Sequence, residues 1–285
     1  MTRIGVQAMM LKDSVAEIGA FESLRRVREI GYRAIEVSQI PMIEANVAQL
    51  ERAKHELGIE IAALSAGLSA GPGGNDSLED DLDKIVADSR RLGTRMVRIG
   101  MLPFDAMRSL EAVVDFCDRT DAYARKLADA GIRLYYHNHH VEFAKLDGRL
   151  MLDIIADRAP HVGLELDVHW LQRGGVNPVS VIEQYAGRVR MVHLKDYRIG
   201  RLPGAAFQAL EKGDVAGFMT AFAGVVQFAE VGEGNLDFAT IIPASIQSGA
   251  EYLLVEQDDL YGRTVWEALQ TSHDNLVALG FADLF

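Results

Sequence analysis

Side chains suited to chemistry gather around one stretch of the chain, residues 135–143 (YYHNHHVEF). An apolar run leads directly into three histidines and the carboxylate of Glu142. Five of the eight histidines lie between His137 and His169, and His193 follows in a similar setting. Imidazoles and carboxylates at the end of a buried segment can bind a metal ion or transfer protons. We therefore interpret this stretch as one wall of a metal-centred active site.

Three later apolar runs also end in ionisable side chains. These are Glu165, Asp167 and His169 in the sixth run, His193, Lys195 and Asp196 in the seventh, and Glu256, Asp258 and Asp259 in the eighth. Alternate residues share one face while the backbone stays extended, so each run can aim two groups at one point. Carboxylates with an imidazole suit Mn²⁺, Mg²⁺ or Co²⁺. Any one residue could instead be a surface loop group, but their recurrence favours a common site.

The elements that must position these groups follow a regular order of amphipathic helix, glycine and short apolar strand. We expect helices over 17–30, 46–57, 78–92, 107–130 and 178–185, and strands over 4–8, 34–38, 59–64, 95–99, 132–136, 162–167, 189–193 and 251–256. Eight strands alternating with helices predict an α/β fold, a closed (β/α)₈ TIM barrel, whose catalytic groups stand at the carboxyl ends of strands. An open doubly wound sheet is the alternative, and the sequence lacks the dinucleotide glycine fingerprint typical of many such sheets.

We expect a single domain over residues 1–285, with two segments that interrupt the rhythm. The glycine-rich segment 70–75 is interpreted as a loop near the mouth of the site, with a phosphate cradle as the alternative. A long loop insertion over about 198–230 could form a lid or an oligomer contact. Together with the apolar end 281–285, it predicts a homo-oligomer or a subunit of a complex.

Composition narrows the partners. The net charge of −12 repels a phosphate backbone, so we expect no nucleic-acid partner. The single cysteine, Cys117, allows no intrachain disulfide and is interpreted as a small buried residue. No apolar run reaches the roughly 18 residues of a membrane span, so we expect no membrane partner and a cytoplasmic location.

These motifs resemble those of the sugar phosphate isomerase/epimerase superfamily of xylose isomerase-like barrels, which includes ketose 3-epimerases, inosose dehydratases and endonuclease IV. The motifs are similar to a YHNH-type subgroup, and they cover the C-terminal half of the chain. The matching segments are Tyr136-His137-Asn138-His139 with Glu142-Phe143, Leu166-Asp167-Val168-His169-Trp170, Val192-His193-Leu194-Lys195-Asp196, Val231-Gly232-Glu233-Gly234 and Val255-Glu256-Gln257-Asp258.

The resemblance implies a divalent metal held by a carboxylate after the fifth strand and by Asp167, His193 and Glu256. We choose Glu142 as the first ligand, with His137 or His139 as the alternative, because the epimerases carry a glutamate on a strand where this chain has histidines. Mn²⁺ is the expected ion, and Mg²⁺, Co²⁺ and Zn²⁺ are alternatives.

The remaining roles also follow from the resemblance. We assign catalysis to Glu142, Glu256 and His139, and substrate binding to His137, His169, Trp170 and Lys195. His169 could instead orient a ligand, Trp170 could pack in the core, and Lys195 could form a salt bridge with Asp196 or Glu165.

The implied reaction is proton abstraction next to the carbonyl of a carbohydrate through an enediolate. The first expectation is an isomerase or epimerase acting on a ketose or keto-sugar. The alternative is a lyase or dehydratase acting on a keto-sugar or keto-inositol, including elimination from a 3-keto-glycoside. A DNA-repair nuclease is disfavoured by the acidic charge. A catalytically inactive barrel that acts as a binding protein is the remaining hypothesis.

Overall fold

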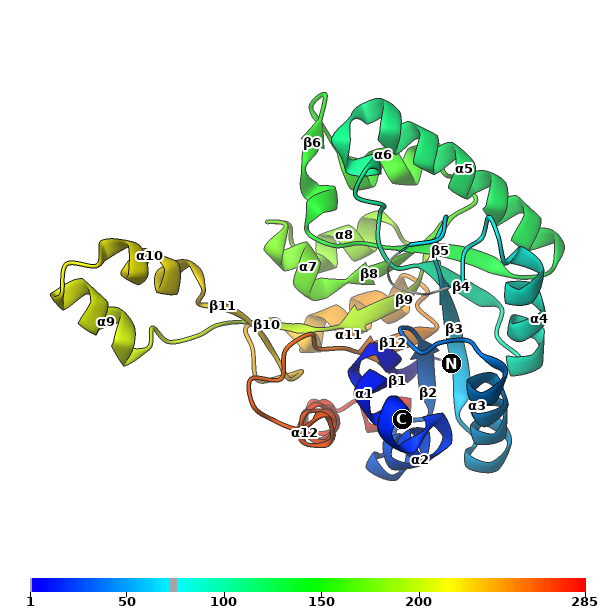
Figure 1. Cartoon of the computed structure of the whole chain (residues 1–285), viewed down its shortest axis with the longest axis horizontal. Helices are drawn as coiled ribbons and strands as arrows, with labels where there is room; N and C mark the ends of the chain where they lie inside the picture. Colours follow the sequence, from blue (N-terminus) through cyan, green and yellow to red (C-terminus); the bar gives the residue numbers. More distant parts are fainter. Residues whose placement is uncertain (1, 72–75) are drawn as a thin grey trace.

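The structure is a computed structural model that describes residues 2–71 and 76–285. Within these residues, eight parallel strands close into a barrel in the order β1-β12-β9-β8-β5-β4-β3-β2 (Figure 1). They are β1 (Arg3–Gln7), β2 (Ala34–Val37), β3 (Glu60–Ala66), β4 (Met96–Ile99), β5 (Arg133–His137), β8 (Gly163–Asp167), β9 (Val189–Leu194) and β12 (Tyr252–Val255). The predicted (β/α)₈ TIM barrel is confirmed. Residues 72–75 of the predicted glycine-rich loop lie outside the described residues.

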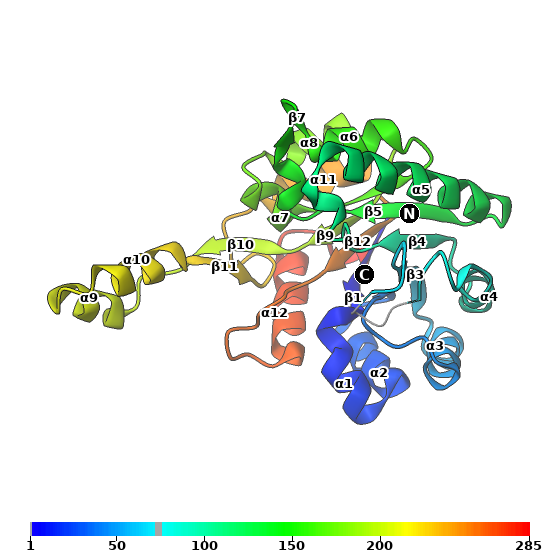
Figure 2. The ribbon, with the colours of Figure 1, turned by 45° about the horizontal axis from the view of Figure 1, so that its top comes forward.

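Helices surround the barrel on its outer side (Figure 2). They are α1 (Lys12–Ile18), α2 (Ala20–Ile30), α3 (Glu44–Leu57), α4 (Leu82–Leu92), α5 (Leu110–Asp129), α6 (Met151–Arg158), α7 (Val168–Arg173), α8 (Pro178–Gln184), α11 (Phe238–Gln247) and α12 (Val265–Ala278), with short 3₁₀ helices η1 (Ala8–Leu11), η2 (Ala106–Arg108), η3 (Val141–Phe143) and η4 (Ala282–Leu284). Among residues 2–71 and 76–285, no helix is long and apolar enough to cross a bilayer. Cys117 is buried in α5, as expected.

Local sequence explains where several helices begin and end. The helix expected over 17–30 is two helices, because Gly19 adopts φ +84° and interrupts the helical backbone. Gly93 ends α4 in the left-handed conformation, at φ +76°. Asn177 caps α8 by accepting a hydrogen bond from the Ser180 backbone N at 3.1 Å, and Pro178 occupies its first turn.

The barrel interior changes from apolar to charged along its axis. A small buried cluster of side chains occupies one level, formed by Ala62, Ala63, Met96, Tyr135, Met191 and Leu254. Two residues further along four of these strands stand Arg98, His137, His193 and Glu256, all buried. Because strand side chains alternate between faces, the charged residues lie on the same inner face as the apolar ones. The carboxyl-terminal half of the barrel is therefore filled by ionisable groups.

The segment 196–229, here called the arm, extends away from the barrel (Figures 1 and 2). Its antiparallel strands β10 (Asp196–Ile199) and β11 (Val226–Ala229) form a ribbon that carries α9 (Gly204–Glu211) and α10 (Val215–Ala223). A second, shorter ribbon is formed by β6 (Lys145–Leu146) and β7 (Arg149–Leu150). The insertion expected as a long loop is thus largely helix and strand, since its apolar residues recur at helical spacing.

Close packing between β1 and β2 gives a test of the barrel. A Cβ added at Gly5 would lie 2.5 Å from the backbone oxygen of Ala34. We predict that Gly5→Ala lowers the free energy of unfolding by about 1–3 kcal/mol, because the strands must separate to admit the methyl group. The measurement is urea denaturation followed by circular dichroism.

Gly204→Ala is the matched control, because an added Cβ there meets none of the described atoms within 4 Å and its φ is not positive. We expect its effect to stay within about 0.5 kcal/mol. Equal stability of the two variants would contradict the close packing described for Gly5.

Candidate metal centre and active site

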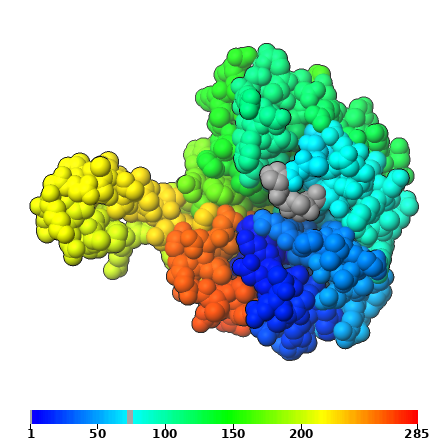
Figure 3. All heavy atoms as spheres, viewed as in Figure 1, coloured from blue at the N-terminus to red at the C-terminus, as the bar shows by residue number. Residues whose placement is uncertain are grey.

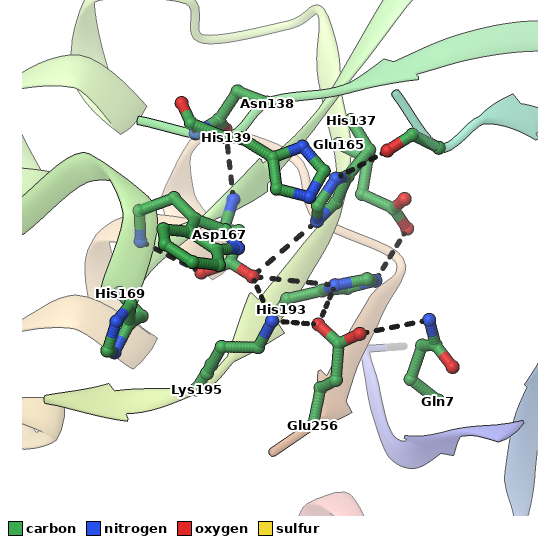
Figure 4. Close-up of polar contacts among 12 residues, drawn as sticks. Gln7, His137, Asn138, His139, Glu165, Asp167, His169, His193, Lys195 and Glu256 are labelled. Carbon is green, nitrogen blue, oxygen red and sulfur yellow. Dashed lines mark hydrogen bonds and ion pairs between the residues drawn. The ribbon is translucent and has the colours of Figure 1, made fainter. Parts of the chain in front are cut away.

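Four buried side chains converge at the carboxyl-terminal end of the barrel (Figure 4). His137, Asp167, His193 and Glu256 each offer one ligand atom, and these atoms all lie within 4.8 Å of one another. The first three come from β5, β8 and β9, and Glu256 follows directly after β12. Adjacent positions in the barrel order therefore bring together residues that are up to 119 positions apart in the chain. We call these four residues the ligand group.

Hydrogen bonds orient two members of the ligand group. His137 Nδ1 lies 3.2 Å from the Gly100 carbonyl oxygen, which accepts its proton. The neutral ring then has its lone pair on Nε2, which lies 3.5 Å from Asp167 Oδ2. Asp167 Oδ1 accepts from the backbone N of Trp170 at 3.1 Å and caps α7. Its other oxygen, Oδ2, is left for the ligand group.

His193 joins the ligand group to a deeper set of charges. Its Nδ1 lies 2.8 Å from Glu256 Oε2. Its Nε2 lies 3.1 Å from both Glu36 Oε2 and Glu165 Oε1. A histidine whose second nitrogen meets carboxylates is a typical metal ligand, because the carboxylates fix the ring and raise its basicity. Nδ1 is therefore the nitrogen suited to a cation.

Arg98 holds the deeper carboxylates. Its guanidinium lies 2.7 Å from Glu36 Oε1 and 3.4 Å from Glu165 Oε2. Burial and the neighbouring Glu36 raise the pKa of Glu165 to about 8. Burial also favours the neutral form of Glu36, but Arg98 and His193 outweigh it and hold the pKa of Glu36 below its usual range. The two carboxyl groups therefore carry about one negative charge between them at neutral pH.

Two residues of this deeper set, Glu36 and Arg98, were not singled out from the sequence. Glu36 lies in the strand AIEV and Arg98 in the strand MVRI, and both strands are buried throughout. A charged residue within a buried strand is the signal that could have identified them. Gln7 was also missed, and its Nε2 donates to Glu256 Oε1 at 3.0 Å.

The ligand group fits a divalent cation. His137 Nε2 and Asp167 Oδ2 are buried and accept no hydrogen bond that meets the usual geometry among the described residues, although Lys195 Nζ lies 3.2 Å from Asp167 Oδ2. Such atoms are costly to bury unless something binds them. Two imidazole nitrogens with two carboxylates form a donor set that suits Mn²⁺, Co²⁺ or Zn²⁺, and it accepts Mg²⁺ with more difficulty because that ion prefers oxygen.

Lys195 adds a positive charge beside the ligand group. Its Nζ lies 2.8 Å from Glu256 Oε2 and 3.2 Å from Asp167 Oδ2 and Asp258 Oδ1. Burial would lower the pKa of Lys195, but these carboxylates outweigh it and hold that pKa above its ordinary value. Burial favours the neutral form of Glu256, but Lys195 and His193 hold its pKa well below normal. The salt-bridge partners of Lys195 are thus Asp167, Glu256 and Asp258, and neither Asp196 nor Glu165 is among them.

Glu142 lies near the ligand group without being part of it. Its carboxylate accepts hydrogen bonds from the Tyr136 hydroxyl and, at 2.8 Å, from the backbone N of His139. Both oxygens are thereby held by the end of β5 and the segment that follows it. Burial raises the pKa of Glu142. The sequence favoured the Glu142 carboxylate as the first ligand. The ligand group contains the His137 nitrogen in its place.

Aromatic side chains line the wall beside the ligand group. The His139 ring lies 4.8 Å from that of His137 and 5.4 Å from Trp170, and burial lowers the pKa of His139 to about 3. The Lys195 ammonium lies 5.2 Å from the Trp170 ring. The chain turns into α7 at Val168, so His169 does not continue the extended backbone of Asp167.

His169 contacts the base of the arm. Its Nδ1 lies 2.9 Å from the Asp196 carbonyl oxygen, and its ring stacks on Phe228 at 4.4 Å between centroids. The Asp196 carboxylate accepts hydrogen bonds from the backbone nitrogens of Gly232 and Gly234 at 2.9 and 2.8 Å. Asp196 and the motif 231–234 therefore fix the path of the chain where the arm returns to the barrel.

Comparison with known proteins gives similar sequences and structures. Over 142 residues, half of this chain, it is 26% identical to an inosose dehydratase of Clostridium beijerinckii. The match spans 45% of that relative, less than half of its length. A sugar phosphate isomerase/epimerase structure from Parabacteroides distasonis has a TM-score of 0.74 at 19% identity, over 99% of this chain and 100% of the other.

A second similar structure was solved with magnesium. It is a xylose isomerase-like TIM barrel protein from Mycobacterium smegmatis, with a TM-score of 0.63 at 16% identity, over 100% of this chain and 98% of the other. At such low identity, both structural matches show a shared fold alone. The YHNH-type subgroup stays a prediction. The sequence profile of the xylose isomerase-like TIM barrel matches residues 24–268, and the chain therefore belongs to this family.

Proposed function

We propose that this protein is a divalent-metal-dependent enzyme that removes a proton from a carbon next to the carbonyl of a keto-sugar or keto-inositol. The observation that carries the proposal is the ligand group of His137, Asp167, His193 and Glu256, in which the buried His137 Nε2 has no hydrogen-bond partner among the described residues. A cation bound there, for which Mn²⁺ is our first choice, would polarise the carbonyl as a Lewis acid. The names of the Clostridium and Parabacteroides proteins support a carbohydrate or polyol ketone.

We assign the proton transfers to His139 and Lys195. The His139 ring lies 4.8 Å from that of His137, and its Nδ1 has no hydrogen-bond partner among the described residues, so the imidazole is placed to accept the proton from carbon. The Lys195 Nζ lies within 3.2 Å of Asp167 and Glu256 and carries three donors, so it can bind a substrate oxygen and donate a proton to it as negative charge develops there. Glu142 acts as a positioning residue, because it holds the backbone N of His139. Trp170 supplies an apolar surface for the ring of the substrate.

The arrangement of these groups favours elimination. An epimerase must return a proton to the opposite face of the same carbon, which requires a second group able to donate. Lys195 and His193 hold Glu256 in its ionised form, so Glu256 is poorly suited to donating. Elimination needs one base and one donor. The C–H electron pair forms a C=C bond, the bond from the β-carbon to oxygen breaks, and the leaving oxygen takes a proton from Lys195 Nζ.

The isomerase or epimerase that the sequence placed first is our second candidate. His139 lies beside the ligand group, with its ring 4.8 Å from that of His137. His139 and Glu256 would be the two groups that transfer protons. A base on each side of the substrate is what that reaction requires.

Metal binding tests the assignment of the ligand group. We expect wild-type protein to bind one divalent ion per chain and His137→Ala to weaken binding on the order of 100-fold or more, since changes behind the ligands alone cost about 10–100-fold. Glu142→Gln should retain the ion. Metal content by mass spectrometry and affinity by titration measure this without any substrate.

Thermal unfolding of the metal-free proteins is the control, because it separates a lost ligand from a lost fold. Loss of metal in Glu142→Gln with retention in His137→Ala would place Glu142 in the ligand set and remove His137 from it.

The next prediction concerns the reaction. With metal-loaded protein in D₂O, we expect a keto-inositol or a 3-keto-glucoside to lose water or its aglycone and to form an enone, as followed by NMR. His139→Gln should lower kcat about 10²–10⁴-fold while metal content stays unchanged, because it removes only the base.

Deuterium next to the carbonyl of an intact sugar would select the epimerase candidate instead. If neither class of ketone changes, and neither exchanges its proton, the proposed enzyme function is wrong. His140→Gln is the matched control, since His140 is exposed and is not a member of the ligand group.

A further inference from the structure

The outer part of the arm has almost no packing of its own. Helices α9 and α10 contact each other (Figure 3 shows them standing clear of the barrel). Within the described residues, α10 has no buried side chain and α9 buries only Ala206. The two helices are 8 and 9 residues long, and isolated helices shorter than about 12–15 residues are marginal in water. Their stability therefore calls for another surface.

Large apolar side chains cover this part of the arm. Val215 and Phe222 are 56% and 54% exposed. The exposed apolar residues of the arm are Ile199, Phe207, Leu210, Val215, Met219 and Phe222. Single exposed apolar residues are ordinary, but a contiguous set on two adjoining helices marks an interaction surface.

The charge of the arm limits what can cover it. The arm, residues 196–229, carries three basic and three acidic side chains, a net charge of zero, which leaves −12 on the rest of the chain. A surface that binds a nucleic acid or an anionic membrane is strongly basic, and the arm is not. In a dimer with a twofold axis, the same surface lies on both sides of the interface, so like charges face each other. Association is therefore favoured where the net charge of that surface is close to zero. The arm is such a surface on an otherwise acidic molecule.

We propose that α9 and α10 pack against the same helices of a second copy of this chain and form a dimer through their arms. Met219 and Phe222, one turn apart on α10, lie on the apolar face that this contact covers. The contact would complete a helical bundle in which each short pair gains the apolar neighbours that its own chain does not provide.

The mass of the protein in solution tests the proposal. We expect the wild type to have about twice the chain mass of 31.3 kDa by light scattering over a range of concentrations. The double variant Met219→Glu with Phe222→Glu should have the mass of one chain, because it buries like charges against their own copies. Ile246→Glu, an equally drastic change at an exposed residue of α11, should leave the mass unchanged.

A shortened arm keeps the test independent of how the charged helices fold. Ile199 pairs with Val226 in the ribbon, so residues 200–225 can be replaced by an Asn-Gly turn. We expect this variant to have the mass of one chain while it retains the thermal transition of the barrel and the metal affinity of the wild type. A wild type with the mass of one chain, or a shortened variant with the mass of two, would overturn the proposal.

Discussion

One buried imidazole, His193, connects two layers of charge, and the site depends on how its two nitrogens are used. Nε2 faces the carboxylates of Glu36 and Glu165, and Nδ1 faces Glu256, at 2.8–3.1 Å. Burial would lower the pKa of His193, but Glu165, Glu36 and Glu256 outweigh it and hold that pKa above its ordinary value. Unpaired charges are costly in a barrel interior, so each group there constrains the next. The orientation of His193 is therefore set by strands on opposite sides of the barrel.

The charges of the interior balance only when His193 carries a proton or a metal ion takes its place. Arg98, Lys195 and the protonated His193 face the acidic groups Glu36, Asp167 and Glu256. Protonation near neutral pH removes much of the charge of Glu165, whose pKa is about 8. One of the three balancing positive charges is thus the proton of His193, which lies in the ligand group. A divalent ion bound there would replace that proton, which links the electrostatics of the fold to the proposed chemistry.

The sequence predicted the barrel because each of its strands is a run of mostly apolar residues that the fold buries. It also placed Asp167, His193 and Glu256 at strand ends, where the structure brings them together. The sequence could not decide between Glu142 and His137 as a metal ligand. That choice depends on η3, which turns the Glu142 carboxylate back to the His139 backbone.

Long-range pairs were hidden for a different reason. Glu36 and Arg98 are separated by 62 residues and meet only when β2 and β4 enter the same barrel. The helical arm was read as a loop, because its glycines at 204, 213, 217 and 224 obscure two short amphipathic segments. Both features depend on long-range contacts or backbone breaks that the hydrophobic pattern of the strands does not encode.

The arm and the site share one continuous piece of chain. Strand β9 ends at Leu194, Lys195 reaches the ligand group, and β10 begins at Asp196. The returning strand β11 places Phe228 against His169. The Phe228 ring lies 5.7 Å from the Lys195 ammonium. A partner that orders α9 and α10 therefore acts on a ribbon whose other end forms a wall of the site. Insertion of this segment after the seventh barrel strand could thus shape both assembly and substrate fit without changing a single metal ligand.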